Sequence, residues 1–156
     1  MTATLDVGAE APDFTLPTDG DSSFSLKDMK GQKVVLYFYP KDDTPGCTKE
    51  AIGFSEHKAD FERAGAVIVG VSPDSPGKHD KFKAKHDLTI TLAADEDKAL
   101  CEAYGVWVEK SMYGRTYMGV ERATFLIDET GCIANVWRKV KVKGHVEAVL
   151  DAVKAH

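Results

Sequence analysis

Two unbroken apolar runs stand out in the first half of the chain. Residues 34–39 are a continuous series of β-branched and aromatic side chains, which is typical of a strand buried on both faces. Residues 67–71 repeat this character, and residues 89–92 predict a third, shorter strand. Pro40 ends the first run, because proline cannot donate a hydrogen bond to a neighbouring strand. The pattern predicts the central strands of a buried sheet.

The segments between these strands carry the end signals of helices. One helix is expected from residue 46 or 47 to about residue 63, because Gly65 stands where a C-terminal cap would lie. A second helix is expected to reach about residue 86, since Ser75-Pro76 supplies an N-cap and a proline at the first helical position. Residues 95–104 predict a third, short helix.

The two ends of the chain predict hairpins and a final helix. Residues 11–26 are expected to form a β-hairpin that turns at Asp19-Gly20. Residues 123–128 and 132–138 predict a second hairpin. A last helix begins at about residue 144, after which valine and leucine residues recur at helical spacing.

This order of elements predicts an α/β protein with a thioredoxin-like fold. Strands that alternate with helices, followed by a hairpin and a terminal helix, indicate a mixed central sheet with helices on both faces and an N-terminal β-hairpin. The chain has 156 residues, of which 43% are hydrophobic and 29% are charged. That length and balance suit a single domain over residues 1–156 with a buried core.

The charge of the chain argues against two classes of partner. The formal net charge is -5, whereas nucleic acids and anionic membrane surfaces favour basic patches, so we expect neither as a partner. No apolar run approaches the roughly 20 residues of a membrane span. Residues 1–10 lack the charged start and apolar core of a signal peptide. We therefore expect a cytoplasmic protein.

The cysteines and histidines exclude several chemistries. The three cysteines, Cys47, Cys101 and Cys132, make neither a disulfide framework nor a CxxC pair. The five histidines are never closer than seven residues in sequence, so no local metal-binding pair is present. We therefore expect no metal site, with a site assembled from distant residues as the alternative, and no cofactor.

Cys47 is the candidate nucleophile because of its place in the chain. It falls in the first turn of a predicted helix that directly follows a buried strand. Unpaired N–H groups and the helix dipole favour negative charge there, and the thiolate is the reactive form of cysteine. On position alone, a buried and inert core cysteine is an equally good interpretation.

The predicted helix directs Cys47 toward the sheet. Its sheet-facing stripe comprises Cys47, Ala51, Phe54, Lys58 and Phe61. The preceding loop, residues 41–46, would wall the site, and Thr44 in that loop offers a hydroxyl group. The arrangement predicts a recessed thiol in a small pocket.

Pro40, Thr44 and Cys47 stand at the spacing Pro-x-x-x-Thr-x-x-Cys, directly after an apolar strand. This spacing resembles the active-site signature of peroxiredoxins. The longer string from Val35 to Ala51 is similar to the bacterioferritin-comigratory-protein or peroxiredoxin Q branch of that family. The likeness extends over nearly the whole chain, with further matches at residues 8–14, 70–74, 143–145 and 149–150.

The resemblance implies a thiol-dependent peroxidase that acts on hydrogen peroxide and organic hydroperoxides. In this family the cysteine attacks the terminal peroxide oxygen and becomes a sulfenic acid. Arg122 matches the position of an arginine that the family brings from a later strand, although its residue context alone would also suit a solvated edge residue. The resemblance implies that Arg122 and the Thr44 hydroxyl stabilise the leaving oxygen, and that Pro40 shields the site.

The sequence departs from the family at the resolving cysteine. Many members carry it five residues after the nucleophile, where this chain has Ile52, and others carry it on the next helix, where residues 75–86 contain none. Cys101 and Cys132 match no resolving position of the family, and we interpret both as structural, with resolution by either as the alternative. We expect a one-cysteine cycle in which thioredoxin, glutaredoxin or a small thiol reduces the Cys47 sulfenic acid.

Two further features allow more than one interpretation. Glu50 matches a common family residue that would bind the loop or Arg122, and it equally suits the first turn of a helix as an acid. Residues 107–121 are interpreted as a loop whose large side chains pack in the core, with a pocket edge or a subunit contact as alternatives. These side chains are Trp107, Met112, Tyr113, Tyr117 and Met118. The resembling branch is often monomeric, so we expect a monomer and keep a dimer as the alternative.

Two other functions compete with the peroxidase hypothesis. A thiol–disulfide oxidoreductase on the same fold normally needs a CxxC pair, which residues 47–50 lack. A redox sensor or binding protein would oxidise Cys47 only to signal, and the presence of Thr44 and Arg122 favours catalysis over that alternative. Insulin reduction would reveal the first rival, and steady peroxide consumption would separate the second.

Overall fold

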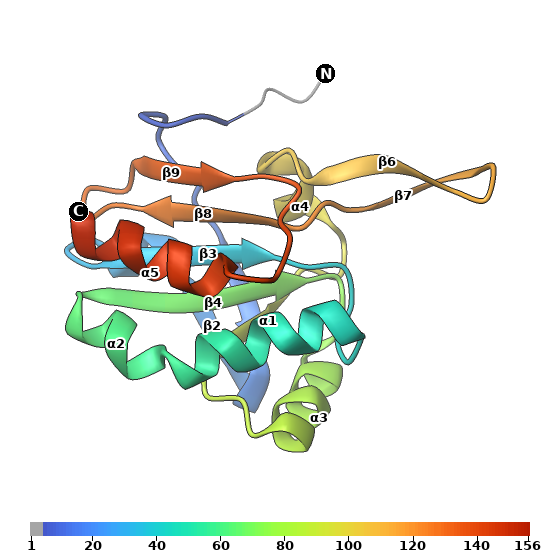
Figure 1. The fold of residues 1–156 in the computed structure, drawn as a ribbon, viewed down its shortest axis with the longest axis horizontal. Helices are drawn as coiled ribbons and strands as arrows, with labels where there is room; N and C mark the ends of the chain where they lie inside the picture. Colours follow the sequence, from blue (N-terminus) through green and yellow to red (C-terminus); the bar gives the residue numbers. More distant parts are fainter. Residues whose placement is uncertain (1–4) are drawn as a thin grey trace.

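The computed structural model describes residues 5–156 and shows a mixed central sheet (Figure 1). Residues 1–4, part of the stretch in which no signal peptide is expected, lie outside the described residues. The strands of this sheet are β1 (Thr15–Thr18), β2 (Ser22–Ser25), β3 (Lys33–Phe38), β4 (Ala66–Ser72), β5 (Thr91–Ala94), β8 (Ala123–Ile127) and β9 (Ile133–Trp137). They are hydrogen-bonded in the order β2-β1-β5-β4-β3-β8-β9. A separate two-stranded sheet consists of β6 (Trp107–Met112) and β7 (Arg115–Val120).

Helices of very different length cover the two faces of the sheet. The α-helices are α1 (Pro45–Glu56), α2 (Lys58–Arg63), α3 (Pro76–His86), α4 (Ala99–Ala103) and α5 (His145–Ala155). Two short 3-10 turns, η1 (Asp19–Asp21) and η2 (Leu26–Met29), flank β2. Across residues 5–156, none of the helices combines the length and the apolar character needed to cross a membrane.

Strand β3 is the centre of the fold. All six of its residues are buried, as the unbroken apolar run predicts. Val35 lies opposite Ile68 of β4 in parallel register and opposite Leu126 of β8 in antiparallel register. Because β8 runs antiparallel to β3, the start of β8 lies beside the end of β3. Residues just before β8 therefore meet residues just after β3.

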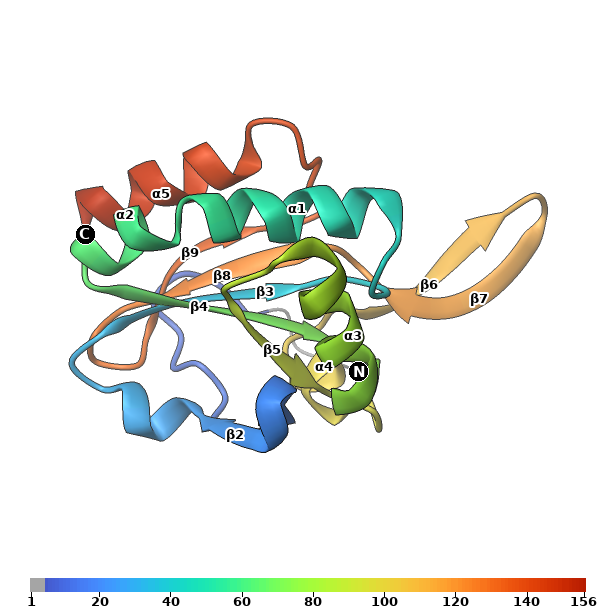
Figure 2. The same cartoon turned by 90° about the horizontal axis from the view of Figure 1, so that it is seen from below.

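Two apolar clusters fill the space on either side of the sheet (Figure 2). On one face, α1, α2, α3 and α5 pack over a cluster that includes Cys47, Phe54 and Phe61. On the other face, α4 and the N-terminal region cover a cluster that includes Leu100 and Tyr104. The predicted fold is confirmed: a mixed central sheet carries helices on both faces, and β1 and β2 form the N-terminal β-hairpin.

The helix expected over residues 46–63 is two helices. The axis turns at His57, where φ is -98° and ψ is 6°, outside helical geometry. The turn moves Lys58 off the predicted stripe and lets Phe54 and Phe61 pack with their ring centroids 5.8 Å apart. The rest of the stripe faces the sheet as predicted, since Cys47 and Ala51 are also buried.

The prediction of a loop with core side chains over residues 107–121 is wrong. Strands β6 and β7 form a hairpin, hereafter the arm (residues 107–120), which projects away from the body of the molecule (Figures 1 and 2). Its turn is made by Tyr113 and Gly114, with φ of 52° and 76°, as the favoured two-residue hairpin turn requires. Trp107, Val108 and Val120 at the base of the arm are partly or fully buried, whereas its other large apolar side chains are exposed: Met112, Tyr113, Tyr117 and Met118.

Candidate active site

The loop between β3 and α1 places Cys47 at the start of a helix. Strand β3 ends at Phe38, and Pro40 follows it half-buried. Thr44 has the extended geometry of an N-cap residue, and Pro45 occupies the first helical position. Cys47 is the third residue of α1 and is 1% exposed. The thiol is therefore recessed at the end of the helix that favours an anion.

Arg122 reaches Cys47 from the segment just before β8. The pairing of Ala123 with Phe38 brings this segment to the end of β3, and the N–H of Val140 donates to the Arg122 carbonyl at 3.0 Å. The Arg122 Nη2 lies 3.2 Å from the Cys47 Sγ. A guanidinium at this distance favours a thiolate over a neutral thiol.

Glu50 holds the other side of the same guanidinium. The Arg122 Nη1 donates to the Glu50 Oε1 at 2.7 Å, and the Glu50 side chain is fully buried. Burial raises the pKa of Glu50 to about 7, although the charge of Arg122 opposes this shift. Burial acts to lower the pKa of Arg122, but Glu50 and Cys47 outweigh it and raise that pKa. The guanidinium therefore remains charged between two groups that are anionic when ionised.

His145 closes the buried side of this cluster. Its Nε2 is 2.7 Å from the Thr124 Oγ1 and 4.0 Å from the Glu50 Oε2, an oxygen with no hydrogen-bond partner within residues 5–156. Burial, with a smaller contribution from the charge of Arg122, lowers the pKa of His145 to about 4. His145 is therefore neutral near pH 7, and Arg122 alone compensates the carboxylate. The sequence match at residues 143–145 contains this histidine but assigned it no role.

Thr44 lies next to the thiol in the chain but does not contact it. Its Oγ1 donates to the Lys41 carbonyl at 2.9 Å, which leaves the oxygen able to accept one more hydrogen bond. Gly46 leaves room for the guanidinium, because a Cβ at that position would lie 3.1 Å from the Arg122 Nη2 and would require the guanidinium to shift. The structure thus brings Cys47, Arg122 and Glu50 into contact and places Thr44 at the rim.

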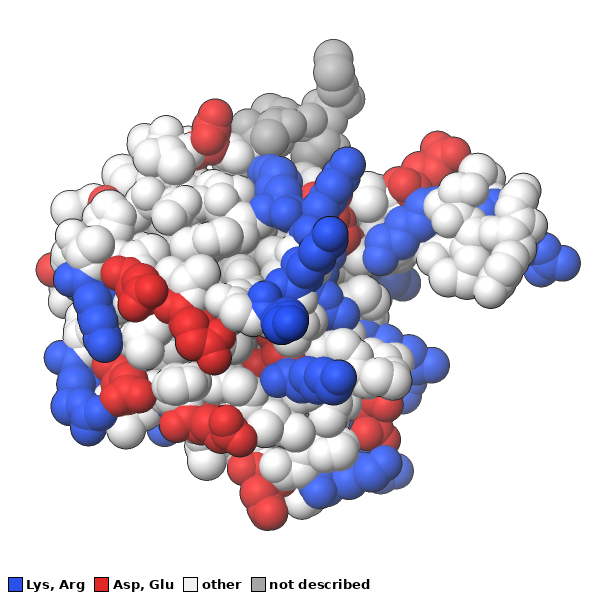
Figure 3. Space-filling view, viewed as in Figure 1, with Lys and Arg blue, Asp and Glu red and all other residues white. Residues whose placement is uncertain are grey.

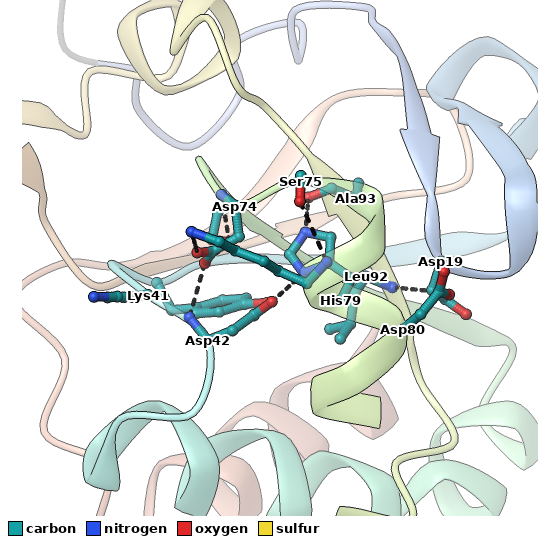
Figure 4. Close-up of polar contacts among 12 residues, drawn as sticks. Asp19, Lys41, Asp42, Asp74, Ser75, His79, Asp80, Leu92 and Ala93 are labelled. Carbon is teal, nitrogen blue, oxygen red and sulfur yellow. Dashed lines mark hydrogen bonds and ion pairs between the residues drawn. The ribbon is translucent and has the colours of Figure 1, made fainter. Parts of the chain in front are cut away.

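A buried network, missed by the sequence analysis, anchors the loop to α3 (Figure 4). Asp42 accepts a hydrogen bond from the Tyr39 hydroxyl at 2.6 Å, and its other carboxylate oxygen lies 2.6 Å from the His79 Nδ1. The His79 Nε2 lies 3.0 Å from the Ala93 carbonyl. The His79 ring thus lies between the Asp42 carboxylate and the Ala93 carbonyl and ties the loop to β5 as well as to α3. The Asp42 N–H also donates to Asp74 at 2.7 Å.

A second, exposed contact joins the same loop to the same helix. Asp43 has φ of 61° and lies 2.7 Å from the Lys85 Nζ and 2.8 Å from the His86 Nε2. Hydrogen bonds from Lys85 and His86 lower the pKa of Asp43. Comparing histidines only by their spacing could not reveal these pairs, because loop and helix are far apart in sequence. The only sequence signal for these contacts was the pair of adjacent aspartates, Asp42 and Asp43, in the loop before Cys47.

The other two cysteines lie away from Cys47. Cys101 is fully buried in the cluster on the opposite face of the sheet. Cys132 lies by the turn after β8 and bridges Glu10, at the end of the sheet where β3 begins. The length of β3 therefore separates it from Cys47, roughly 16 Å for the five steps of about 3.3 Å between its six residues. All three cysteines are free. Within the described residues, no group of three or more His, Cys, Asp and Glu side chains is arranged to hold a metal ion.

Comparison with known proteins agrees with this geometry. The AhpC/TSA family model matches residues 7–136, and the chain therefore belongs to the AhpC/TSA family. The chain is 50% identical over 151 residues to peroxiredoxin Bcp of Bacillus subtilis, which covers 97% of this chain and 96% of that protein. It is 47% identical over 154 residues to peroxiredoxin Bcp of Xanthomonas campestris, covering 99% and 96% of the two chains.

Solved structures give the same result. The Xanthomonas campestris bacterioferritin comigratory protein, described with an alkyl peroxide reduction activity, superposes with a TM-score of 0.91 at 46% identity and covers 97% of this chain and 99% of that one. A cysteine variant of the Xylella fastidiosa peroxiredoxin Q superposes with a TM-score of 0.93 at 42% identity, over 99% and 98% of the two chains. The chain is thus a peroxiredoxin of the bacterioferritin-comigratory-protein branch, a thiol-dependent peroxidase with a peroxide substrate and a thiol reductant.

Proposed function

We propose that Cys47 is the residue that attacks the peroxide and that Arg122 is its electrostatic partner. The observation that carries this assignment is the 3.2 Å contact between the Arg122 Nη2 and the Cys47 Sγ at the first turn of α1. The thiolate attacks the terminal oxygen, the O–O bond breaks, and the released oxygen takes up a proton to leave as water or an alcohol. Arg122 and the N–H groups of the helix start stabilise the negative charge on the leaving oxygen.

Thr44 and Pro40 complete the site in this proposal. The Thr44 oxygen can accept the hydrogen of a bound hydroperoxide while its own hydrogen stays on Lys41. Pro40 limits the access of water from the end of β3. Glu50 is a positioning residue, because it binds the far side of the Arg122 guanidinium and fixes its plane.

We further propose a one-cysteine cycle completed by an external thiol. Cys101 is buried across the sheet from Cys47, and Cys132 lies near the opposite end of β3, so neither is placed to form a disulfide with Cys47. Thioredoxin, glutaredoxin or a small thiol would then reduce the sulfenic acid. Both hydrogen peroxide and organic hydroperoxides are proposed as substrates, supported by the alkyl peroxide activity of the Xanthomonas protein. A monomer in a reducing compartment such as the cytoplasm suits this chemistry.

Oxidation without any reductant tests this proposal directly. One equivalent of hydrogen peroxide is added to the fully reduced protein, and intact mass and peptide mapping follow. We expect one added oxygen on Cys47, trapped by a sulfenic-acid reagent, and unchanged Cys101 and Cys132. A loss of two hydrogens with Cys47 joined to another cysteine would replace the one-cysteine cycle by an internal one. No rapid change at Cys47 would overturn its assignment as the nucleophile.

A further inference from the structure

The surface beside Cys47 is basic although the whole chain is acidic. Figure 3 shows lysine and arginine side chains gathered over the segment that leads into α5 and near the amino end of α1. Residues 138–143, hereafter the basic segment, have the sequence RKVKVK and contain no acid, while the formal net charge of the chain is -5. The Val140 N–H binds the Arg122 carbonyl, so the basic segment is attached to the active site itself.

Most of this positive charge is not compensated. Arg138 lies 3.9 Å from Glu121, but the three lysines of the basic segment make no ion pair with any residue in the range 5–156. These exposed lysines are Lys139, Lys141 and Lys143. Lys49, exposed two residues after Cys47, is also without an ion-pair partner in that range. Uncompensated charge of one sign attracts a partner of the opposite sign.

The arm begins and ends at the same site and carries exposed apolar side chains. Met112 is 56% exposed, Tyr113 at the tip is 97% exposed, and Tyr117 is 45% exposed. Strand β7 ends at Val120, two residues before Arg122. Tyrosine and methionine are enriched in the cores of protein interfaces, and methionine adapts its shape to a partner.

One face of the arm is turned toward Cys47. Lys110 is paired with Tyr117 and Met112 with Arg115, so these four residues share a face, while Met118 is paired with Glu109 on the other. The Lys110 side chain lies over Gly119, where a Cβ would come within 3.2 Å of it, and so points back along the arm toward its base. Desolvation lowers the pKa of Lys110, and the charges of Arg122 and Cys47 also act on it, as expected if this face borders the site.

We propose that the Lys110 face of the arm and the basic segment together form the docking surface for an acidic protein that carries the reducing thiol. The proposal rests on the one-cysteine cycle above. A small thiol would contact only the rim of the site around Cys47. The exposed Met112, Tyr113 and Tyr117 belong to the arm, which projects away from the body of the molecule and offers contacts to a larger partner. The uncompensated lysines make the partner's matching surface acidic.

The reductive step is balanced by thiols that the partner supplies. A thiolate of the docked protein attacks the sulfur of the Cys47 sulfenic acid, an S–S bond forms, the S–O bond breaks, and the oxygen leaves as water after protonation. A second thiol of the partner, or of a second molecule, then attacks the mixed disulfide. This attack releases the Cys47 thiol and leaves the reductant oxidised.

Charge reversal tests the basic segment. The probe is an acidic bacterial thioredoxin with its reductase and NADPH, and the readout is its KM at saturating peroxide. Lys139→Glu/Lys141→Glu/Lys143→Glu should raise this KM on the order of tenfold and abolish its dependence on salt. The matched control, Lys27→Glu/Lys30→Glu/Lys154→Glu, makes the same change in net charge with exposed lysines at the other end of β3 and should leave the KM unchanged.

Two methionines on opposite faces test the arm. Met112→Ser removes an apolar group from the Lys110 face and should raise the KM for thioredoxin several-fold. Met118→Ser is the matched control, because Met118 lies on the other face and is 49% exposed, against 56% for Met112. This variant should leave the KM for thioredoxin unchanged. Oxidation of Cys47 by peroxide alone is measured for every variant, so a failure of the proposed nucleophile is distinguished from a failure of docking.

Three outcomes would overturn the docking surface. An unchanged KM for thioredoxin in both the triple and the Met112→Ser variants would show that neither region binds this class of partner. If the triple lysine variant lost turnover with glutathione but kept its KM for thioredoxin, the lysines would bind a small anionic thiol instead of a protein. If Met112→Ser changed self-association in sedimentation but not the KM, the arm would bind a second copy of this chain.

Discussion

Cys47 and Cys101 occupy equivalent places on opposite faces of one sheet. Each is the third residue of its helix, α1 or α4, and the two are 1% and 0% exposed. Their neighbours have opposite charge. The Arg122 guanidinium lies 3.2 Å from the Cys47 sulfur, whereas the Asp95 carboxylate binds the N–H of Cys101 at 2.8 Å.

Under the proposed assignment of Cys47, this difference in adjacent charge separates a reactive cysteine from an inert one in this fold. Burial raises the pKa of Cys101, and hydrogen bonding to Asp95 raises it further, so this thiol stays neutral and a poor nucleophile. Cys47 is equally inaccessible and has the same helical position, so neither burial nor the helix dipole separates the two. The sign of the adjacent charge does, and it comes from chain segments outside the helices.

Exchanging each cysteine for serine gives the largest expected contrast. Cys47→Ser should lose thiol-dependent peroxide turnover entirely, because the variant lacks the proposed nucleophile. Cys101→Ser should retain most of the turnover, since a serine hydroxyl can donate to Asp95 in the same space. Steady-state peroxide consumption with dithiothreitol measures both. Comparable losses in the two variants would mean that Cys101 takes part in the cycle.

Removing the positive charge of Arg122 should make Cys47 a poor nucleophile, as Cys101 is. Arg122→Gln should slow the oxidation of Cys47 by hydrogen peroxide by about 10²–10³-fold, as loss of a donor to a developing anion does. Arg122→Lys should lose less, because it keeps the charge but cannot bind Glu50 and the sulfur together. Rapid-quench alkylation gives the rate of oxidation.

The buried Glu50 requires a control for this experiment. Arg122→Gln leaves its carboxylate without a partner, which alone can disturb the site. The double variant Arg122→Gln/Glu50→Gln removes that charge as well. If the double variant recovered the wild-type rate, the effect of Arg122 would be structural and its proposed contact with the reacting oxygen would be wrong.

The same contrast between buried and exposed charge applies to the loop in front of Cys47. Asp42→Asn removes the carboxylate that accepts from the Tyr39 hydroxyl and contacts the His79 Nδ1 inside the protein, and should lower the free energy of unfolding by about 3 kcal/mol. Asp43→Asn breaks only the surface pairs with Lys85 and His86, and should lower the free energy of unfolding by much less. Asparagine tolerates the left-handed backbone at residue 43, so no strain is added.

Urea unfolding of the two variants at pH 7 measures this difference. Asp42→Asn should also slow Cys47 oxidation, because the loop loses its buried anchor. Equal stability changes in both variants would mean that the buried contacts of Asp42 contribute no more to stability than the surface pairs of Asp43.

The sequence predicted the parts of the molecule whose surroundings are set locally. The apolar run of β3, the proline at the first position of α1 and the spacing of Cys47 from Ala51 and Phe54 specify a sheet-facing cysteine at a helix start. Arg122 was found only through its family resemblance, because its meeting with Cys47 depends on the antiparallel pairing of β8 with β3.

The sequence analysis failed where tertiary context decides. The arm is mostly exposed beyond its base, so its strands lack the alternation that marks a half-buried strand, and Tyr113 is an unusual residue for a left-handed turn. The helix expected over residues 95–104 starts only at Ala99, because Lys98 has φ of 63°, outside helical geometry. The Asp95 side chain still accepts a hydrogen bond from the Leu100 N–H in the first turn of this helix. The pairing of Asp42 with His79 spans 37 residues of sequence and leaves no local pattern.

The pH dependence of stability should depend on Glu50. Its pKa is about 7 in the folded protein, because burial outweighs the attraction of Arg122, against 4.5 for an unperturbed glutamate. The folded state therefore binds this proton more tightly than the unfolded state, so the free energy of unfolding falls as the pH rises from about 4.5 to about 7. The full difference corresponds to at most about 3 kcal/mol. Urea unfolding at several pH values measures it.

Glu50→Gln removes this titration and should flatten the stability profile of the protein in that pH window. The exposed Glu62→Gln is the matched control and should leave the wild-type slope in place, since its partner Lys58 is also exposed. Parallel profiles for wild type and Glu50→Gln would show that Arg122 keeps the carboxylate ionised throughout. In that case the Glu50 carboxylate would offset the positive charge of Arg122 at every pH in this window. The net positive charge beside Cys47 would then be smaller than the comparison with Cys101 implies.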